Sequence, residues 1–199
     1  MPADLFGSTP ATHPPHILLG DKRKHGEFYT DDRLALAICR VLGTMAAPPF
    51  AILEPGCGGG AFLRAASAEW PKAMLVGVDL APACSGPGSV VEGDLFKTAG
   101  KYGLVVGNPD FAIAERVVRH CLGLLAPGGH LAFLLRSAFL GSEGRVALYT
   151  EFPLRAFAPI AQRPSFTGDG KTDPMEYGLY VWQQGFRGRG EIQPPLVWR

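Results

Sequence analysis

A glycine-rich segment that follows a short apolar run is the feature that most constrains the fold of this 199-residue chain. The run Phe-Ala-Ile-Leu over 50–53 leads into Glu54, Pro55 and the sequence Gly-Cys-Gly-Gly-Gly over 56–60. An apolar run that ends at such a loop is typical of a buried parallel strand entering a tight turn, where glycine lets a ligand approach the main chain. Residues 61–66 then predict a helix whose free N–H groups face the loop, so the segment predicts a nucleotide-type cofactor site.

The loop alone is compatible with two classes of cofactor. The spacing Gly-x-Gly-x-x-Ala that starts at Gly56 satisfies the dinucleotide fingerprint, which also uses an acidic residue roughly 20 positions later on the ribose. Asp79 lies 19 residues beyond the last glycine of the loop, and it fits that requirement in either class. The pattern Glu-x-Gly-x-Gly-x-Gly over 54–60 resembles instead the first motif of class I S-adenosylmethionine (SAM) methyltransferases. Both classes stay open at this point.

A later apolar run, residues 102–107, ends in Asn108, Pro109, Asp110 and Phe111. This ending resembles the Asn-Pro-Pro-Tyr/Phe motif of methyltransferases that act on planar amino nitrogens, namely adenine N6, guanine N2 and protein glutamine. A dinucleotide dehydrogenase has no reason to carry it. Together with the earlier motifs in the same order, it favours a class I SAM-dependent amino-methyltransferase, a resemblance that covers roughly residues 28–135.

The resemblance implies how SAM would be held. Asp79, at the end of a second apolar run, would accept hydrogen bonds from the ribose hydroxyls. Asp94 would reach the adenine amino group while Leu95 covers the ring. The sequence Phe-Tyr-Thr over 28–30 is similar to the element that such enzymes place near the methionine end of SAM, although Thr30 or Asp31 can equally serve only as a helix cap. The expected SAM-binding residues are Tyr29, Thr30, Glu54, Pro55, Gly56, Cys57, Gly58, Gly60, Asp79, Leu80, Asp94, Leu95 and Asn108.

The same resemblance implies the chemistry of the reaction. The side-chain oxygen of Asn108 and the carbonyl of Pro109 would each accept a hydrogen bond from one target NH₂ group, which aims the nitrogen lone pair at the SAM methyl. Phe111 would stack on the target ring. Asp110 departs from the motif, which usually has a second proline there, and proline would fix φ. This departure leaves open a SAM-binding partner protein without activity.

A polar loop over 163–173 precedes an apolar run over 177–182 and is expected to contact the target. Its sequence resembles small phage- or prophage-type adenine-N6 DNA methyltransferases, so DNA is the leading partner, with an RNA base or a protein glutamine as alternatives. A basic cluster over 22–25 is a second candidate contact for phosphate. The expected substrate-binding residues are Phe111, Arg163, Ser165, Phe166 and Lys171.

Composition limits the remaining function classes. Nineteen basic against 18 acidic residues give no global attraction to nucleic acid, so such binding needs a local patch. The four cysteines show no metal-ligand spacing, and we expect reduced thiols, no metal site and a cytoplasmic protein. Neither a membrane-spanning run nor a signal peptide is expected. The oligomeric state stays open.

These patterns predict an α/β fold in three layers, Rossmann-like as in SAM methyltransferases. We expect a seven-stranded, mostly parallel sheet whose last strand is antiparallel, with the site at the carboxyl ends of the strands. The expected organisation is a flexible arm over 1–27, a methyltransferase domain over 28–185 and a flexible tail over 186–199.

Overall fold

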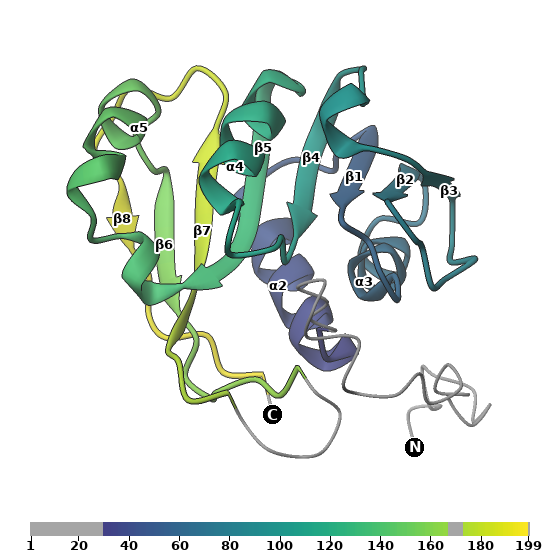
Figure 1. The fold of residues 1–199 in the computed structure, drawn as a ribbon, viewed down its shortest axis with the longest axis horizontal. Helices are drawn as coiled ribbons and strands as arrows, with labels where there is room; N and C mark the ends of the chain where they lie inside the picture. The colour runs from purple at the N-terminus through teal and green to yellow at the C-terminus, as the bar shows by residue number, and fades with distance from the viewer. Residues whose placement is uncertain (1–29, 167–172, 199) are drawn as a thin grey trace.

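The structure, a computed structural model, describes residues 30–166 and 173–198. The expected arm with its basic cluster, together with Tyr29 and Lys171, lies outside the described residues. The described chain forms one sheet with helices on both faces (Figure 1). The strands are β1 Ala51–Pro55, β2 Met74–Asp79, β3 Ser89–Glu92, β4 Tyr102–Gly107, β5 Leu125–Arg136, β6 Ala156–Pro159, β7 Tyr177–Gln183 and β8 Glu191–Ile192. The helices are α2 Asp32–Met45, α3 Ala61–Glu69, α4 Ala114–Gly123 and α5 Val146–Glu151, with 3₁₀ turns η2 Leu95–Lys97, η3 Ser137–Phe139 and η4 Glu143–Arg145.

The order of strands across the sheet is β3-β2-β1-β4-β5-β7-β6-β8. The first five strands are parallel, β7 runs antiparallel between β5 and β6, and β8 pairs in parallel with β6. The chain moves outward from β1 to β3 and then returns to place β4 on the other side of β1. The carboxyl ends of β1 and β4 therefore meet at a topological switch point, where ligands of open α/β sheets bind.

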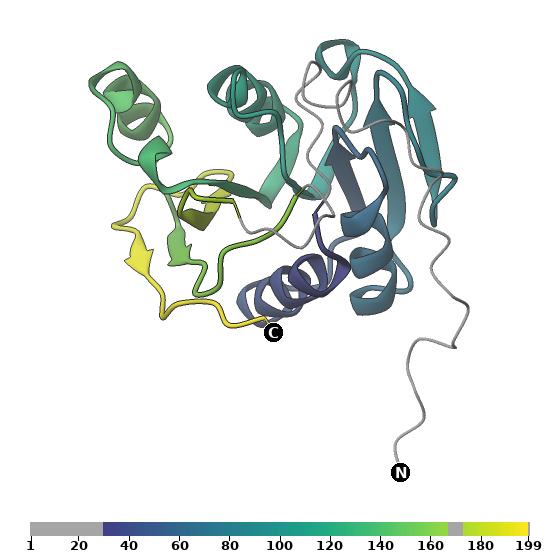
Figure 2. The same ribbon diagram turned by 60° about the horizontal axis from the view of Figure 1, so that its bottom comes forward.

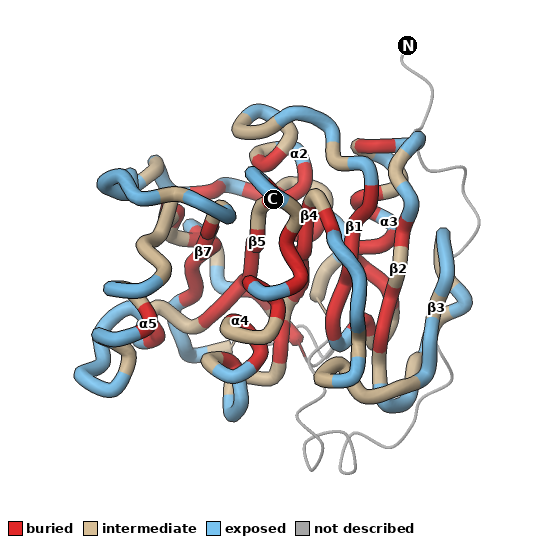
Figure 3. The backbone as a smooth tube through the Cα atoms, turned by 90° about the horizontal axis from the view of Figure 1, so that it is seen from above, coloured by how far each residue is buried: buried red, intermediate tan, exposed pale blue. Residues whose placement is uncertain are grey.

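Helices α2 and α3 cover one face of the sheet, and α4 and α5 cover the other (Figure 2). Alternate strand residues supply the two cores: Leu104 and Val106 of β4 face α2 and α3, whereas Val105 faces α4. Buried residues are concentrated in β1, β4, β5 and β7, while β3 at the sheet edge is mostly exposed (Figure 3). Strands buried on both faces need apolar side chains at every position, which explains the continuous apolar runs of the sequence.

The expected fold class is confirmed, with one correction: the sheet has eight strands rather than seven. The additional strand, β8, lies in the segment 186–199 for which we expected a flexible tail. There the backbone of Leu196 donates to Pro159 at 2.7 Å and accepts from Ala161 at 2.9 Å, and Leu196 and Trp198 are buried. Half of the residues in this segment are glycine, proline or arginine, and we therefore did not expect its two apolar side chains to anchor it. In the described part of the chain, no helix is long and apolar enough to cross a membrane.

Candidate active site

The glycine loop after β1 depends on three residues with positive φ. Gly56, Gly58 and Gly60 have φ values of 65°, 44° and 72°, a region that side chains rarely adopt. A Cβ atom on Gly60 would also lie 2.8 Å from the sulfur of Cys84, so close approach is a second reason for glycine there. The backbone N–H groups of Gly56 and Cys57 both donate to the Val78 carbonyl, which fixes the loop to β2.

Glu54 lies beneath this loop and joins β1 to α3. Its side chain is buried, and its carboxylate accepts from the backbone N–H groups of Phe62 at 3.3 Å and Leu63 at 2.8 Å. These N–H groups belong to the first turn of α3, where no intrahelical partner exists. Burial raises the pKa of Glu54 to about 8, against the opposing effect of the two N–H groups and Arg64. Glu54 therefore fixes the helix to the strand and so sets the shape of the loop.

The acidic residues expected at the cofactor lie along the neighbouring loops. Asp79 accepts from the N–H of Gly58 at 2.8 Å and from the N–H of Ala81 at 2.9 Å, so it links the end of β2 to the glycine loop. Asp94 caps η2 by accepting from the N–H of Phe96 at 2.9 Å. Leu80 is exposed, and Leu95 is half-buried. The backbone N–H of residue 93 donates to the Asp79 carbonyl, which holds the two acidic segments together.

Asn108 follows β4 directly and contacts the segment that enters α2. Its amide nitrogen donates to the Thr30 hydroxyl at 3.2 Å. The cap of α2 is Asp31, which accepts from the N–H of Arg33, so Thr30 is not the side-chain cap of this helix. The other amide atom of Asn108, Oδ1, is buried and has no hydrogen-bond partner in the described structure. A buried acceptor without a partner is costly unless a ligand satisfies it.

Asp110, which replaces the usual second proline, forms a local turn. Its carboxylate accepts from the N–H of Ala112 at 2.9 Å, and its carbonyl accepts from the N–H of Ile113 at 3.3 Å. Such an Asx-type turn is a common alternative to proline for redirecting a chain. The turn leads from Pro109, which is buried, into α4.

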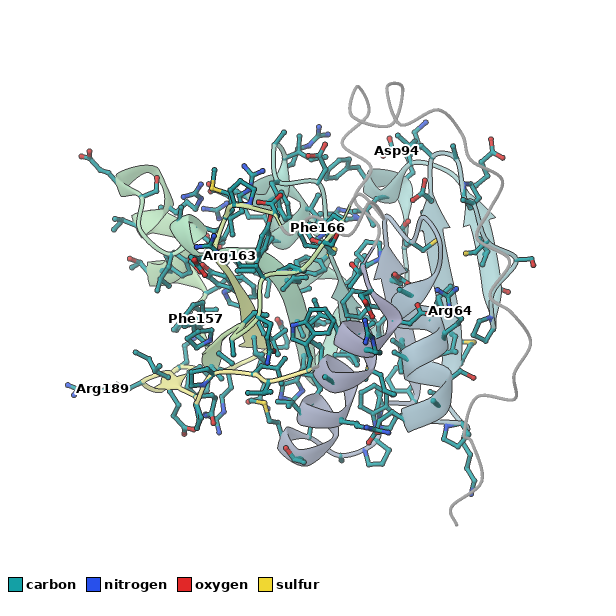
Figure 4. All side chains as sticks on the ribbon, turned by 90° about the horizontal axis from the view of Figure 1, so that it is seen from below. Arg64, Asp94, Phe157, Arg163, Phe166 and Arg189 are labelled. Atoms are coloured by element: carbon teal, nitrogen blue, oxygen red, sulfur yellow. The ribbon has the colours of Figure 1, made fainter. Side chains whose placement is uncertain are left out.

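The target residues expected from the sequence divide into two groups. The rings of Phe111 and Phe166 lie 6.5 Å apart edge to face, and the hydroxyl of the adjacent Ser165 is buried. Arg163 forms an ion pair with Glu176 and is half-exposed. Figure 4 shows Arg163 and Phe166 on the segment that leads from β6 to β7. The structure thus brings Phe111, Ser165 and Phe166 together, whereas Arg163 is held by an acidic neighbour.

The group formed by Phe111, Ser165 and Phe166, here called the aromatic corner, includes two further residues that were not expected from the sequence. Arg136 ends β5 and places its guanidinium 4.9 Å from the centre of the Phe111 ring. Tyr177, its partner across the antiparallel pair, begins β7 and lies 5.6 Å from the same ring. Burial raises the pKa of Tyr177 to about 12, an effect that the nearby guanidinium opposes. The sequence did contain one sign that Arg136 belongs to the site: it is a basic residue at the carboxyl end of an apolar run, where ligands of open α/β sheets bind.

Comparison with known proteins gives the fold a family context. No protein-family model and no curated protein sequence matches the chain. A Listeria monocytogenes protein assigned to the class I SAM-dependent methyltransferases superposes with a TM-score of 0.67 at 13% identity, over 90% of this chain and 70% of that one. The N-methyltransferase NodS from Bradyrhizobium japonicum superposes with a TM-score of 0.55 at 21% sequence identity, over 77% of this chain and 96% of NodS. The M protein of the type I restriction enzyme EcoKI superposes with a TM-score of 0.59 at 16% identity, over 81% of this chain and 44% of the M protein.

The chain has the Rossmann-like fold of class I SAM-dependent methyltransferases. Within this methyltransferase fold, the glycine loop and Asn108 occupy the carboxyl ends of two adjacent strands, β1 and β4. The aromatic corner around Phe111 lies beside them, at the ends of β4 and β5 and the start of β7. No cluster of histidine, cysteine and acidic side chains arranged for a metal ion occurs in the ranges 30–166 and 173–198.

Proposed function

We propose that the protein transfers a methyl group from SAM to an exocyclic amino nitrogen, with adenine N6 in DNA as the leading acceptor. The buried Oδ1 of Asn108 is the observation that carries this proposal. An acceptor atom held in this position without a protein partner suits an NH group of a ligand. The Thr30 hydroxyl occupies the amide nitrogen and thereby leaves the oxygen for that ligand.

The glycine loop and its acidic neighbours fit SAM. Backbone with positive φ at Gly56, Gly58 and Gly60 leaves the main chain open to close approach, and a Cβ atom on Gly56 would meet no atom within 4 Å. Asp79 and Asp94 would contact the ribose and the adenine amino group of the cofactor, with Leu80 and Leu95 beside the ring. The glycine loop is shaped by Glu54 and Pro55, which precede it, and by Cys57 within it. Near the methionine end of SAM would lie Tyr29 and Thr30. The methyltransferase BpumL, another fold neighbour, was solved with SAH, the demethylated form of SAM.

Two acceptor atoms of the chain would orient the target nitrogen. The side-chain oxygen of Asn108 and the carbonyl of Pro109 each take one hydrogen bond from the same NH₂ group. Accepting both hydrogens draws the nitrogen toward tetrahedral geometry and directs its lone pair away from the ring. SAM supplies a methyl group that is electrophilic because its sulfur is cationic. No strong base is needed before attack, because the methylated nitrogen is acidic enough to lose its proton afterwards.

The fold neighbours differ in their named substrates, so the support for one acceptor comes from the site and not from the fold. They include proteins described as an O-methyltransferase, an N-methyltransferase and an RNA methyltransferase. Phe111, three positions after Asn108, is partly exposed and packs edge to face against the buried ring of Phe166, an aromatic setting that suits a planar ring. An RNA base or a protein glutamine is the second candidate, and the near-equal numbers of basic and acidic residues are compatible with it. Asp110 is engaged in a turn, and this role is compatible with activity.

The test is transfer of labelled methyl from SAM to duplex DNA, single-stranded DNA, RNA and a protein extract. We expect label in DNA as N6-methyladenine and a loss of about 100-fold or more in Asn108→Ala, since the variant lacks the orienting acceptor. SAM binding by the variant shows that its fold is intact. Label only in RNA or protein would keep the mechanism and replace the acceptor. No label in any sample, with SAM bound, would contradict the proposed activity and support a non-catalytic SAM-binding role.

A further inference from the structure

Unsatisfied polar atoms gather on the acceptor side of the candidate site. Among the residues that the structure describes, six buried side-chain polar atoms have no hydrogen-bond partner. Four of them belong to this corner: Oδ1 of Asn108, Nε of Arg136, Oγ of Ser165 and the hydroxyl of Tyr177, which lies opposite Arg136. Native structures contain few such atoms, and a group of them in one place indicates where a polar ligand binds.

Arg136 lies on the same face of the sheet as Asn108. Strands β4 and β5 are parallel and pair Val106 with Ala132, and alternate residues of a strand share a face. Asn108 lies two positions after Val106, and Arg136 lies four positions after Ala132. Both residues are therefore on the face that α2 and α3 cover. Both side chains therefore leave the sheet at its carboxyl edge on one side, where Thr30 also contacts Asn108.

The guanidinium of Arg136 extends the aromatic surface of Phe111. It lies 4.9 Å from the centre of that ring, and the rings of Phe166 and Tyr177 pack against Phe111 from other directions. A guanidinium is planar, always charged and able only to donate hydrogen bonds. No carboxylate in the described ranges forms an ion pair with Arg136. Its buried Nε–H is thus a donor on the same face and at the same carboxyl edge of the sheet as the acceptor of Asn108.

We propose that Arg136 is the specificity residue of the acceptor site. This rests on the proposed function: while Asn108 accepts from the target amino group, the Nε–H of Arg136 donates to an acceptor atom adjacent to that group. Adenine presents this pair as N6–H and N1, and cytosine and primary amides present the same pair. Guanine presents N1–H on the Watson–Crick side of its amino group, so two donors would face each other if guanine were bound by that edge.

The test uses binding, with SAH in place of SAM so that no transfer occurs. Labelled single-stranded oligonucleotides carry one adenine, 1-deazaadenine or 7-deazaadenine, so that no base pair is altered. We expect the wild type to bind adenine about tenfold or more tightly than 1-deazaadenine, the size of one hydrogen bond to a charged donor, and to bind 7-deazaadenine like adenine. Arg136→Met keeps an unbranched side chain but lacks every N–H donor, so it should bind adenine and 1-deazaadenine alike.

A second arginine provides the matched control. Arg145 also lies over an aromatic ring, that of Phe139, in the part of the structure that carries η4 and α5. Arg145→Met should keep the preference of the wild type, and unchanged SAH binding in both variants reports an intact fold. The proposal is overturned if Arg136→Met keeps the preference or if the wild type shows none, including through lack of binding.

Methyl transfer measured on the same samples separates this proposal from the proposed function. Transfer by a wild type that shows no preference would refute the role of Arg136 and leave the activity in place. A preference that depends on Arg136, without transfer to any acceptor, would refute the activity and leave the recognition role in place.

Discussion

The amide nitrogen of Asn108 donates to the hydroxyl of Thr30 at 3.2 Å, across 78 positions of sequence. An asparagine side chain can exchange its oxygen and nitrogen by rotation, and only its hydrogen bonds decide which atom points where. In the structure the Thr30 hydroxyl accepts from the nitrogen, and the oxygen is the atom presented to the site. The segment that enters α2 thus contacts Asn108, the residue that follows β4.

Thr30→Val should slow methyl transfer because it removes the acceptor that orients the amide while keeping the shape of the side chain. The loss of one such hydrogen bond predicts a decrease in kcat of about 2- to 15-fold. Single-turnover kinetics at saturating SAM would measure it. Thr30→Ser retains the hydroxyl and should stay near the wild-type rate, and equal rates for Thr30→Val and wild type would contradict an orienting role.

Gly60→Ala should destabilise the protein more than Gly56→Ala. Both glycines have positive φ, but only at Gly60 would the new Cβ meet an atom, the sulfur of Cys84 at 2.8 Å. We expect a loss of about 1–2 kcal/mol in the free energy of unfolding for Gly56→Ala and of about 2–4 kcal/mol for Gly60→Ala. Urea denaturation without cofactor would measure both.

The variant Cys84→Ala shows whether the sulfur causes this difference. In the Gly60→Ala background it should recover part of the lost free energy of unfolding, and in the Gly56→Ala background it should recover none. Recovery in neither background would mean that the backbone strain alone accounts for the cost at Gly60.

Trp198→Ala should show that the end of the chain contributes to stability. Trp198 is buried, its indole N–H donates to the Gln162 carbonyl at 3.1 Å, and its backbone N–H donates to the Gln162 side chain. We expect a loss of about 3–5 kcal/mol, or roughly 6–20 °C in Tm. Val197→Ala, at an exposed neighbour, is the control and should change Tm little. Similar small effects in both variants would support the flexible tail that the composition suggested.

Local sequence patterns were sufficient to predict the strands and loops that build the cofactor side. Apolar runs marked β1, β2 and β4, because strands buried on both faces tolerate few polar residues. The glycines at 56, 58 and 60 indicated the loop through a requirement of the backbone itself, positive φ, that needs no knowledge of distant residues. The position of Asn108 followed in the same way from the end of an apolar run.

Contacts between distant segments were not predictable in this way. The bond from Asn108 to Thr30 and the placement of Arg136 over Phe111 depend on the register of β4 against β5 and on the packing of α2. The sequence places these residues far apart, and no local pattern marks them as neighbours. The role of Glu54 in holding α3 was missed for another reason: its partners are two backbone N–H groups, which no side chain marks in the sequence.

Glu54 should make the stability of the protein depend on pH in an unusual direction. Burial raises its pKa to about 8 in the folded state, above the ordinary value of about 4.3 expected in the unfolded chain. Between these values the folded state binds more protons than the unfolded state, so a rise in pH lowers the free energy of unfolding. The contribution of the protonated carboxyl is fully present below about pH 4 and is lost as the pH rises through about 8.

Glu54→Gln removes this titration and serves as the reference. We compare the free energy of unfolding of the wild type with that of the variant and expect the difference, wild type minus variant, to fall by about 3 kcal/mol between pH 5 and pH 8. The reason is that the wild type must ionise a buried carboxyl group as the pH rises, whereas the amide of the variant does not titrate. Urea denaturation at pH 5, 6.5 and 8 would measure the difference. Glu143→Gln, which removes an exposed carboxylate, controls for general charge effects. A difference that stays constant across this range would show that the two N–H groups of α3 keep Glu54 ionised, in which case the carboxylate would hold the helix as a charged cap.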